Sequence, residues 1–87
     1  MDQTLYNLMD WPEIEAVVYS ECQEPEAILG PHLTDDGVLI QAFLPTAGSV
    51  EVLWEGKRYP MELADEAGFF AVLVPDQKLR PYRYQVT

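Results

Sequence analysis

The stretch D-G-V-L-I-Q-A-F-L-P, from Asp36 to Pro45, decides the fold class that the sequence predicts. Asp36-Gly37 is typical of a hairpin turn. The run Val38–Leu44 is apolar at every position except one Gln, which fits a strand covered on both faces. Pro45 ends this strand, because proline has no amide hydrogen to give to a sheet. We therefore expect Val38–Leu44 to be a central strand.

Five further short strands are indicated by apolar or aromatic runs that Gly, Pro or Asp residues bound. They are expected at His32–Thr34, Ser49–Trp54, Lys57–Leu63, Phe69–Val74 and Tyr82–Val86. Strands that recur about every ten residues, with turn signals between them, are typical of sandwiches. The sequence therefore predicts an all-β fold, a small antiparallel immunoglobulin-like β-sandwich with a short N-terminal helical segment.

The N-terminal part of the chain predicts the helical segment. Asp10-Trp11-Pro12 is a typical helix start, with Asp10 or Trp11 at the cap, and the helix is expected to reach about Cys22. A second short turn is expected at Pro25–Leu29. We divide the chain into an arm with a short helix packed on the sheet, residues 1–30, and the β-sandwich, residues 31–87. Together they form one compact domain.

The charge of the chain narrows the classes of partner. Among 87 residues, 15 are acidic and five are basic, which gives a formal net charge of -10. Such a surface repels phosphate groups, so we expect neither nucleic acid nor a membrane as partner. The single cysteine, Cys22, excludes an internal disulfide and a cysteine-based zinc site. The start Met1-Asp2-Gln3 is unlike a signal peptide, and we expect a cytoplasmic protein without metal or cofactor.

A catalytic site is not expected. A glycosidase needs two carboxyl groups about 5–9 Å apart across a cleft, one with a raised pKa. The adjacent carboxylates of this chain, such as Asp35-Asp36 and Asp65-Glu66, lie on expected turns instead. The only histidine, His32, is expected to form a local hydrogen bond where the sheet begins. Phosphate-binding loops and nucleophile motifs are absent from the sequence.

One stretch favours ligand binding: V-L-W-E-G-K-R-Y-P-M-E-L, Val52 to Leu63. Trp54 precedes a tight Glu55-Gly56 turn, and Lys57 and Tyr59 follow it. Indole rings stack on the CH faces of sugars and lysines donate to hydroxyls, so Trp54, Lys57 and Tyr59 are candidates for contact with a neutral α-glucan. The alternative is that Trp54 caps the core, since alternation puts it on one face with Val52.

Several stretches together resemble the N-terminal β-sandwich modules of glycogen-active enzymes, which are related to starch- and glycogen-binding modules. The resemblance rests on Gly37–Ala47, Ser49–Val52, Trp54–Met61, Gly68–Phe70 and Tyr82–Tyr84. After a short helix, the stretch E-P-E-A-I-L-G-P-H, Glu24 to His32, resembles the start of bacterial 1,4-α-glucan branching enzymes that carry two such modules in tandem. The resemblance extends from Ile14 to Val86, and this chain is similar to the first of the two modules.

The resemblance implies a host enzyme of glycogen biosynthesis that cleaves α-1,4 chains and reattaches them through α-1,6 bonds. Its chemistry resides in a (β/α)₈ barrel, none of which is in this chain, so no catalytic residue is carried over. The implied partners are the second N-terminal module, the barrel and, weakly, α-glucan. The implied role is to support domain arrangement and chain-length choice.

Two alternatives to glucan contact remain open. In the first, the chain is a structural module that docks on the rest of the enzyme, which an exposed apolar patch of Leu5, Tyr6, Leu8 or Met9 would favour. In the second, it is a generic immunoglobulin-like protein-interaction module unrelated to glucan.

Overall fold

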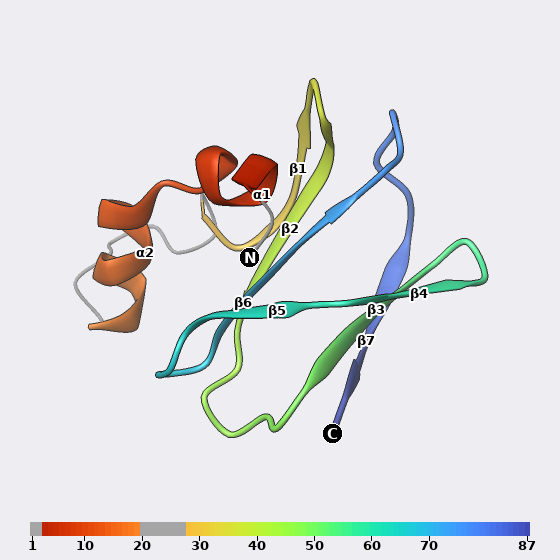
Figure 1. The fold of residues 1–87 in the computed structure, drawn as a ribbon. Helices are drawn as coiled ribbons and strands as arrows, with labels where there is room; N and C mark the ends of the chain where they lie inside the picture. Colours follow the sequence, from red (N-terminus) through yellow and green to blue (C-terminus); the bar gives the residue numbers. More distant parts are fainter. Residues whose placement is uncertain (1–2, 20–27) are drawn as a thin grey trace.

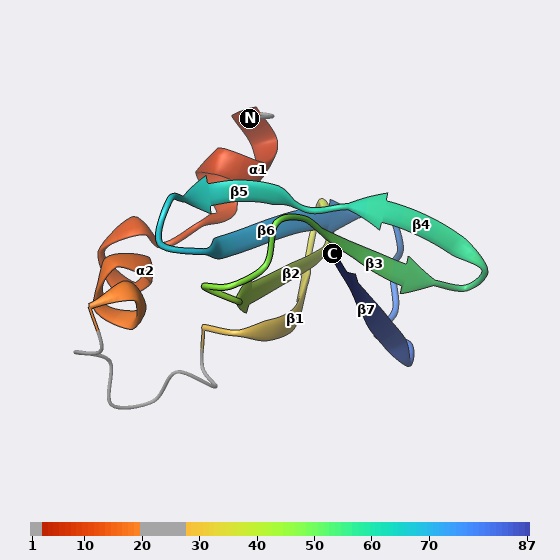
Figure 2. The ribbon, with the colours of Figure 1, turned by 90° about the horizontal axis from the view of Figure 1, so that it is seen from below.

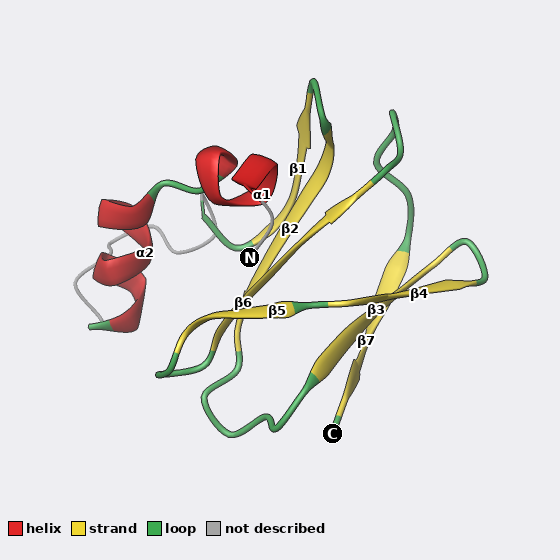
Figure 3. Ribbon diagram, in the orientation of Figure 1, coloured by secondary structure: helices red, strands yellow, loops and turns green. Residues whose placement is uncertain are grey.

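The computed structural model of the protein describes residues 3–19 and 28–87. In that part of the chain, two short helices precede seven strands (Figure 3). The elements are α1 (Gln3–Leu8), α2 (Trp11–Val18), β1 (Gly30–Thr34), β2 (Gly37–Phe43), β3 (Val50–Trp54), β4 (Lys57–Pro60), β5 (Glu62–Asp65), β6 (Phe69–Val74) and β7 (Tyr82–Val86).

The strands form two antiparallel sheets. Sheet A has the order β1-β2-β6-β5, and sheet B has the order β4-β3-β7. Both helices lie on one side of sheet A, and sheet B lies on its other side (Figure 1). The prediction of a small antiparallel sandwich with an N-terminal helical segment is confirmed.

Sheet A is covered on both faces. Val38 and Ile40 of β2 belong to the core cluster between the two sheets, which also contains Val52 of β3. Leu39, whose side chain points the other way, belongs to a second cluster with residues of both helices, including Ile14. This explains the nearly unbroken apolar run that marks β2 as a central strand.

The predicted single strand Lys57–Leu63 is wrong in one respect: it is two strands in different sheets. β4 pairs with β3 in sheet B and ends at Pro60, and β5 begins at Glu62 in sheet A. Met61, between them, is buried at 8 % exposure, and its amide donates to the carbonyl of Val50 (2.9 Å). The chain therefore crosses from one sheet to the other at Pro60-Met61, and the two strands follow one another as a nearly continuous ribbon (Figure 2).

The helix start at Asp10 is confirmed, but the helix is shorter than predicted. Asp10 is the N-cap, and its carboxylate accepts a hydrogen bond from the amide of Glu13 (3.4 Å). The helix ends at Val18, because the next residue, Tyr19, turns to a ψ of 11° and caps it. The rest of the predicted extent, to Cys22, lies outside the described residues, as does most of the predicted turn at Pro25–Leu29.

The helix α1 was not predicted. Leu5 and Met9 are 4 % and 5 % exposed and belong to the helix-side cluster, with Phe69 of sheet A. Tyr6 remains 50 % exposed. Two of the four residues that were candidates for an exposed docking patch therefore belong to the core of the protein's own fold.

Candidate functional site

The hairpin between β3 and β4 holds the three candidate residues for glucan contact. Its turn residues, Glu55 and Gly56, have positive φ angles of 49° and 76°, as a two-residue hairpin turn requires. In the register of the hairpin, Trp54 lies opposite Lys57, and Tyr59 lies opposite Val52. The three candidates therefore share one face of sheet B, the face that points toward sheet A.

Trp54 has the core position, one of the two alternatives that the sequence left open. Its side chain is 2 % exposed and belongs to the cluster between the sheets. The indole ring lies 5.7 Å, centre to centre, from the ring of Tyr82 on β7. Stacking on a sugar needs an accessible ring face, and Trp54 offers none in this fold.

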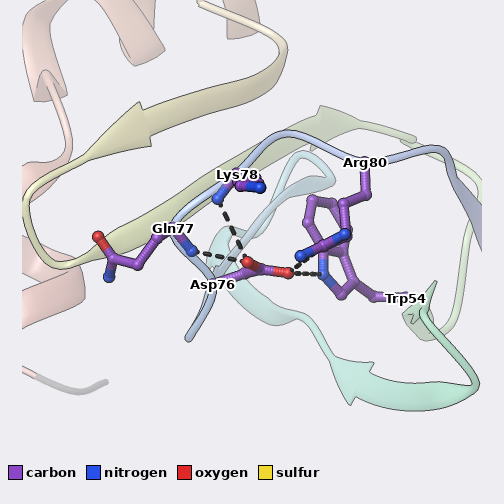
Figure 4. A network of polar contacts seen from close by, with 5 residues as sticks. All are labelled: Trp54, Asp76, Gln77, Lys78 and Arg80. Carbon is purple, nitrogen blue, oxygen red and sulfur yellow. Dashed lines mark hydrogen bonds and ion pairs between the residues drawn. The ribbon is translucent and has the colours of Figure 1, made fainter.

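The polar edge of the Trp54 indole is fixed by Asp76, in the loop between β6 and β7 (Figure 4). One oxygen of this carboxylate, Oδ2, accepts hydrogen bonds from the indole Nε1 (2.9 Å) and from Nε of Arg80 (2.7 Å). The other oxygen, Oδ1, accepts from the amides of Gln77 (2.7 Å) and Lys78 (3.2 Å). Asp76 therefore ties the loop both to itself and to the core.

These bonds keep Asp76 ionised. The hydrogen bond from Arg80, followed by that from Trp54, holds the pKa of the Asp76 carboxyl well below its ordinary value of 3.8. The same contact raises the pKa of the Arg80 guanidinium. A general acid needs a carboxyl whose pKa is raised, so this arrangement serves structure and not proton transfer. Trp54 and Asp76 are 22 positions apart, and no local sequence signal connects them.

The other two candidates differ in accessibility. Lys57 is exposed, whereas Tyr59 is half-buried against the core. The structure thus brings Trp54, Lys57 and Tyr59 together in register, with only the lysine fully at the surface. A contact of Lys57 and Tyr59 with sugar remains a prediction.

Tyr82 and Tyr84 lie on the same face of β7, opposite Trp54 and Val52 of β3. Their rings meet edge to face at 5.4 Å, and their hydroxyl oxygens are 3.3 Å apart. Partial burial, followed by the hydrogen bond to Tyr82, raises the pKa of the Tyr84 hydroxyl. Tyr84 is nevertheless 37 % exposed.

His32 has the local role that its position predicts. Its Nε2 donates to the carbonyl of Ile28 (3.0 Å), which also accepts a bond from the side-chain amide of the buried Gln41 (2.6 Å). The two bonds fix the chain where it enters β1, at Gly30. His32 and Gln41 are therefore occupied in holding the fold.

The described residues offer little for chemistry. Within residues 3–19 and 28–87, His, Asp and Glu side chains do not gather into a group able to hold a metal ion. Three pockets in this part have volumes of about 190, 240 and 210 Å³, below the usual 300–1,000 Å³ of ligand sites. No helix of the described residues has the length and apolar character of a membrane span.

Residues 10–87 match the protein family described as the N-terminal domain of the alpha-1,4-glucan branching enzyme GlgB. The chain belongs to this family. It is 37 % identical over 78 residues to the 1,4-alpha-glucan branching enzyme GlgB of Mycolicibacterium paratuberculosis (strain ATCC BAA-968 / K-10), a match that covers 90 % of this chain and 10 % of that protein.

Two further relatives of the family carry the same description. The enzyme of Mycobacterium tuberculosis (strain ATCC 25177 / H37Ra) is 39 % identical over 75 residues, which cover 86 % of this chain and 10 % of that protein. That of Picrophilus torridus is 43 % identical over 58 residues, 66 % of this chain and 8 % of that protein. The chain thus spans about a tenth of the length of the curated relatives that it matches.

Proposed function

We propose that the chain is the non-catalytic N-terminal module of a cytoplasmic 1,4-α-glucan branching enzyme of glycogen biosynthesis. It supports the arrangement of the other domains, a second N-terminal module and a catalytic barrel, and thereby the length of the chains that are transferred. Support comes from the family match over residues 10–87 and from the names of its relatives.

The burial of Trp54 is the main observation in favour of a role in domain arrangement. The side chain best suited to stack on sugar is 2 % exposed and held by Asp76. Meanwhile, Leu33, Tyr84 and Val86 are 53 %, 37 % and 48 % exposed at the sides of the sandwich. Exposed apolar side chains that gather on one side of a domain are candidates for contact with protein.

The test is a comparison of the full branching enzyme with and without residues 1–87. We expect the deletion to change the chain-length distribution of the branched product, measured by chromatography after debranching. The turnover per folded barrel should change less, because the reacting groups lie elsewhere. The thermal transition of the barrel, measured in both forms, serves as the control for damage to its fold. An unchanged distribution contradicts the proposal.

Weak contact with α-glucan is the second candidate. The observation in its favour is Lys57, which is exposed at the hairpin rim beside the half-buried Tyr59. Titration of the labelled chain with maltoheptaose should shift the amide signals of Lys57 and Tyr59 at millimolar sugar, and Lys57→Ala should weaken the shifts. Arg58→Ala, on the opposite face of the same strand, is the matched control. Signals that stay in place exclude this contact. The family match does not favour an interaction module unrelated to glucan.

A further inference from the structure

The two sheets are joined on one side of the sandwich and open on the other. Because β4 leads directly into β5, the end strands β1 and β7 lie on the opposite side. Leu33 of β1 faces the same way as the core residue Val38, and Tyr84 of β7 faces the same way as the core residue Val52. We call Leu33, Tyr84 and Val86 the open edge, because all three point between the sheets and yet are 53 %, 37 % and 48 % exposed.

The backbone of β7 is also free along this edge. Thr87 and Ser49 exchange two hydrogen bonds. The amide of Thr87 donates to the carbonyl of Ser49 (2.9 Å), and the amide of Ser49 donates to the carbonyl of Thr87 (3.1 Å). Bonded and non-bonded pairs alternate along antiparallel strands, so Arg83 also turns its amide and carbonyl toward β3. Tyr84 and Val86 then turn theirs away, toward the edge where sheet B ends. The residues with exposed apolar side chains thus also carry the unpaired backbone groups that another strand can bind.

The charges near β7 indicate which kind of strand can pair with it. All five basic residues of the chain lie between positions 57 and 83, and residues 1–56 contain none. Arg83 is exposed on the outer face of β7, and within the described residues it has no hydrogen bond or ion pair. Leu53 separates it from Arg58 across sheet B, so two guanidinium groups flank one leucine. Arg58 forms an ion pair with Glu51 of β3 (3.9 Å), so Arg83 is the cation on this face of sheet B that has no carboxylate partner among the described residues.

A second copy of the chain is a poor match for this edge. Two copies joined through β7 would leave Arg83 without a carboxylate partner, because Tyr82–Val86 contains no acidic residue. An acidic strand is a better match, because a carboxylate across from Arg83 forms a favourable cross-strand pair.

We propose that β7 binds an extended acidic segment of a partner protein, which adds to sheet B as a fourth strand. Its apolar side chains, at alternate positions, cover the open edge, and its Asp or Glu side chains between them face Arg83. The proposal goes beyond the proposed function, because it adds a partner protein to the contacts of the module with the other domains of its enzyme.

The test uses the labelled 87-residue chain and two end-blocked nine-residue peptides, one alternating Val or Thr with Glu and one with Lys in place of Glu. With the Glu peptide, we expect shifts of the Tyr84 and Val86 amide signals and at least tenfold slower hydrogen exchange at both. The Lys peptide should bind at least tenfold more weakly at physiological ionic strength, where the attraction between its charge and the net charge of -10 is screened. Arg83→Glu should reverse this preference between the peptides.

Two variants separate strand addition from nonspecific attraction. Val86→Pro removes an amide that points away from β3, so it should abolish peptide binding while the domain stays folded; Val86→Thr keeps the amide and should bind. If Val86→Pro unfolds, Leu33→Asp takes its place, with Leu63→Asp on β5, where the leucine is 54 % exposed, as its control. Leu33→Asp should weaken peptide binding at least fivefold and the control should not.

Three results would overturn the proposal: unmoved β7 signals at millimolar Glu peptide, equal binding of both peptides, or dimers through β7 in sedimentation experiments. Each is independent of the chain-length measurement. A peptide that binds while the full enzyme shows no change on deletion contradicts the proposed function alone. A change on deletion without peptide binding contradicts only the role of β7.

Discussion

β6 and β7 are both short antiparallel strands rich in aromatic and β-branched residues, and yet their surroundings are opposite. β6 is buried at five of its six positions, because the helices cover one face of sheet A and sheet B covers the other. β7 has one neighbouring strand and is exposed at four of its five positions. Strand composition therefore identifies a strand, whereas its place in the layers decides whether it stabilises the fold or remains available for contact.

The largest difference in the free energy of unfolding is expected between the variants Trp54→Ala and Val86→Ala. Trp54→Ala should lower the free energy of unfolding by about 3–5 kcal/mol, since it removes a fully buried ring from the shared core. Val86→Ala should lower it by less than about 1 kcal/mol, because the side chain is already 48 % exposed. Urea unfolding followed by far-UV circular dichroism measures both. Equal losses would show that β7 is as important to stability as the core.

Two glycines at turns allow a second comparison between a crowded position next to β6 and an open position in sheet B. Gly68, before β6, has a φ of +111°, and a Cβ there would lie 2.4 Å from Cα of Pro45. Gly68→Ala should therefore destabilise the domain by about 2–3 kcal/mol. Gly56, in the sheet B hairpin, has a φ of +76° and nothing within 4 Å of its Cβ position, so Gly56→Ala should cost about 1–2 kcal/mol. Thermal unfolding of both variants provides the comparison, and the reverse order would refute it.

A substitution in the helix layer should lower the free energy of unfolding by less than Trp54→Ala or Gly68→Ala. Asp10→Ala removes the N-cap of α2 and should destabilise the domain by about 1 kcal/mol. The effect should be local: hydrogen exchange should accelerate in α2 more than at Val52 of β3. Asp35→Ala, at an exposed turn outside the helix layer, is the control. Faster exchange throughout the chain would show that the helices and the sandwich unfold together.

The smallest effect in acid is expected for Asp76→Asn. At neutral pH the variant should be clearly less stable than the natural chain, because both carboxylate oxygens accept hydrogen bonds and the NH₂ group of Asn cannot accept one. This difference should shrink as the pH falls. A carboxyl whose pKa is lowered on folding stabilises fully above its ordinary value of 3.8, and this contribution is lost as the pH falls toward the lowered pKa. The variant should therefore lose less stability than the natural chain between pH 4 and pH 2, measured by urea unfolding. Arg80→Gln should also flatten this dependence, and an unchanged slope in both would contradict the role of Asp76.

Much of the sandwich was predictable because turns and central strands have local signals. The limits of Phe69–Val74 and Tyr82–Val86 are those predicted, and the Glu55-Gly56 turn lies where it was expected. The split between β4 and β5 was missed, because Pro60 stands in a run that alternates like one strand. Only the burial of Met61 between the sheets shows where the chain changes sheet.

The remaining errors come from contacts between distant residues. α1 has no acidic residue in its first turn and no basic residue in its last, and burial of Leu5 against sheet A holds it. For Trp54, alternation placed the side chain on one face with Val52 and left open whether that face points inward. Its accessibility depended on Asp76, 22 positions later, and on the position of sheet A, neither of which a local pattern records.

The two tryptophans of the chain happen to report on different layers. Trp11 lies in the helix layer, with its ring 4.9 Å from that of Tyr6, whereas Trp54 lies between the sheets. A Trp11→Phe variant would leave one indole whose fluorescence follows the sandwich alone, and Trp54→Phe would leave one that follows the helices. The fluorescence of Trp11 and Trp54 can therefore show, without an added label, whether the helix layer or the sandwich unfolds first.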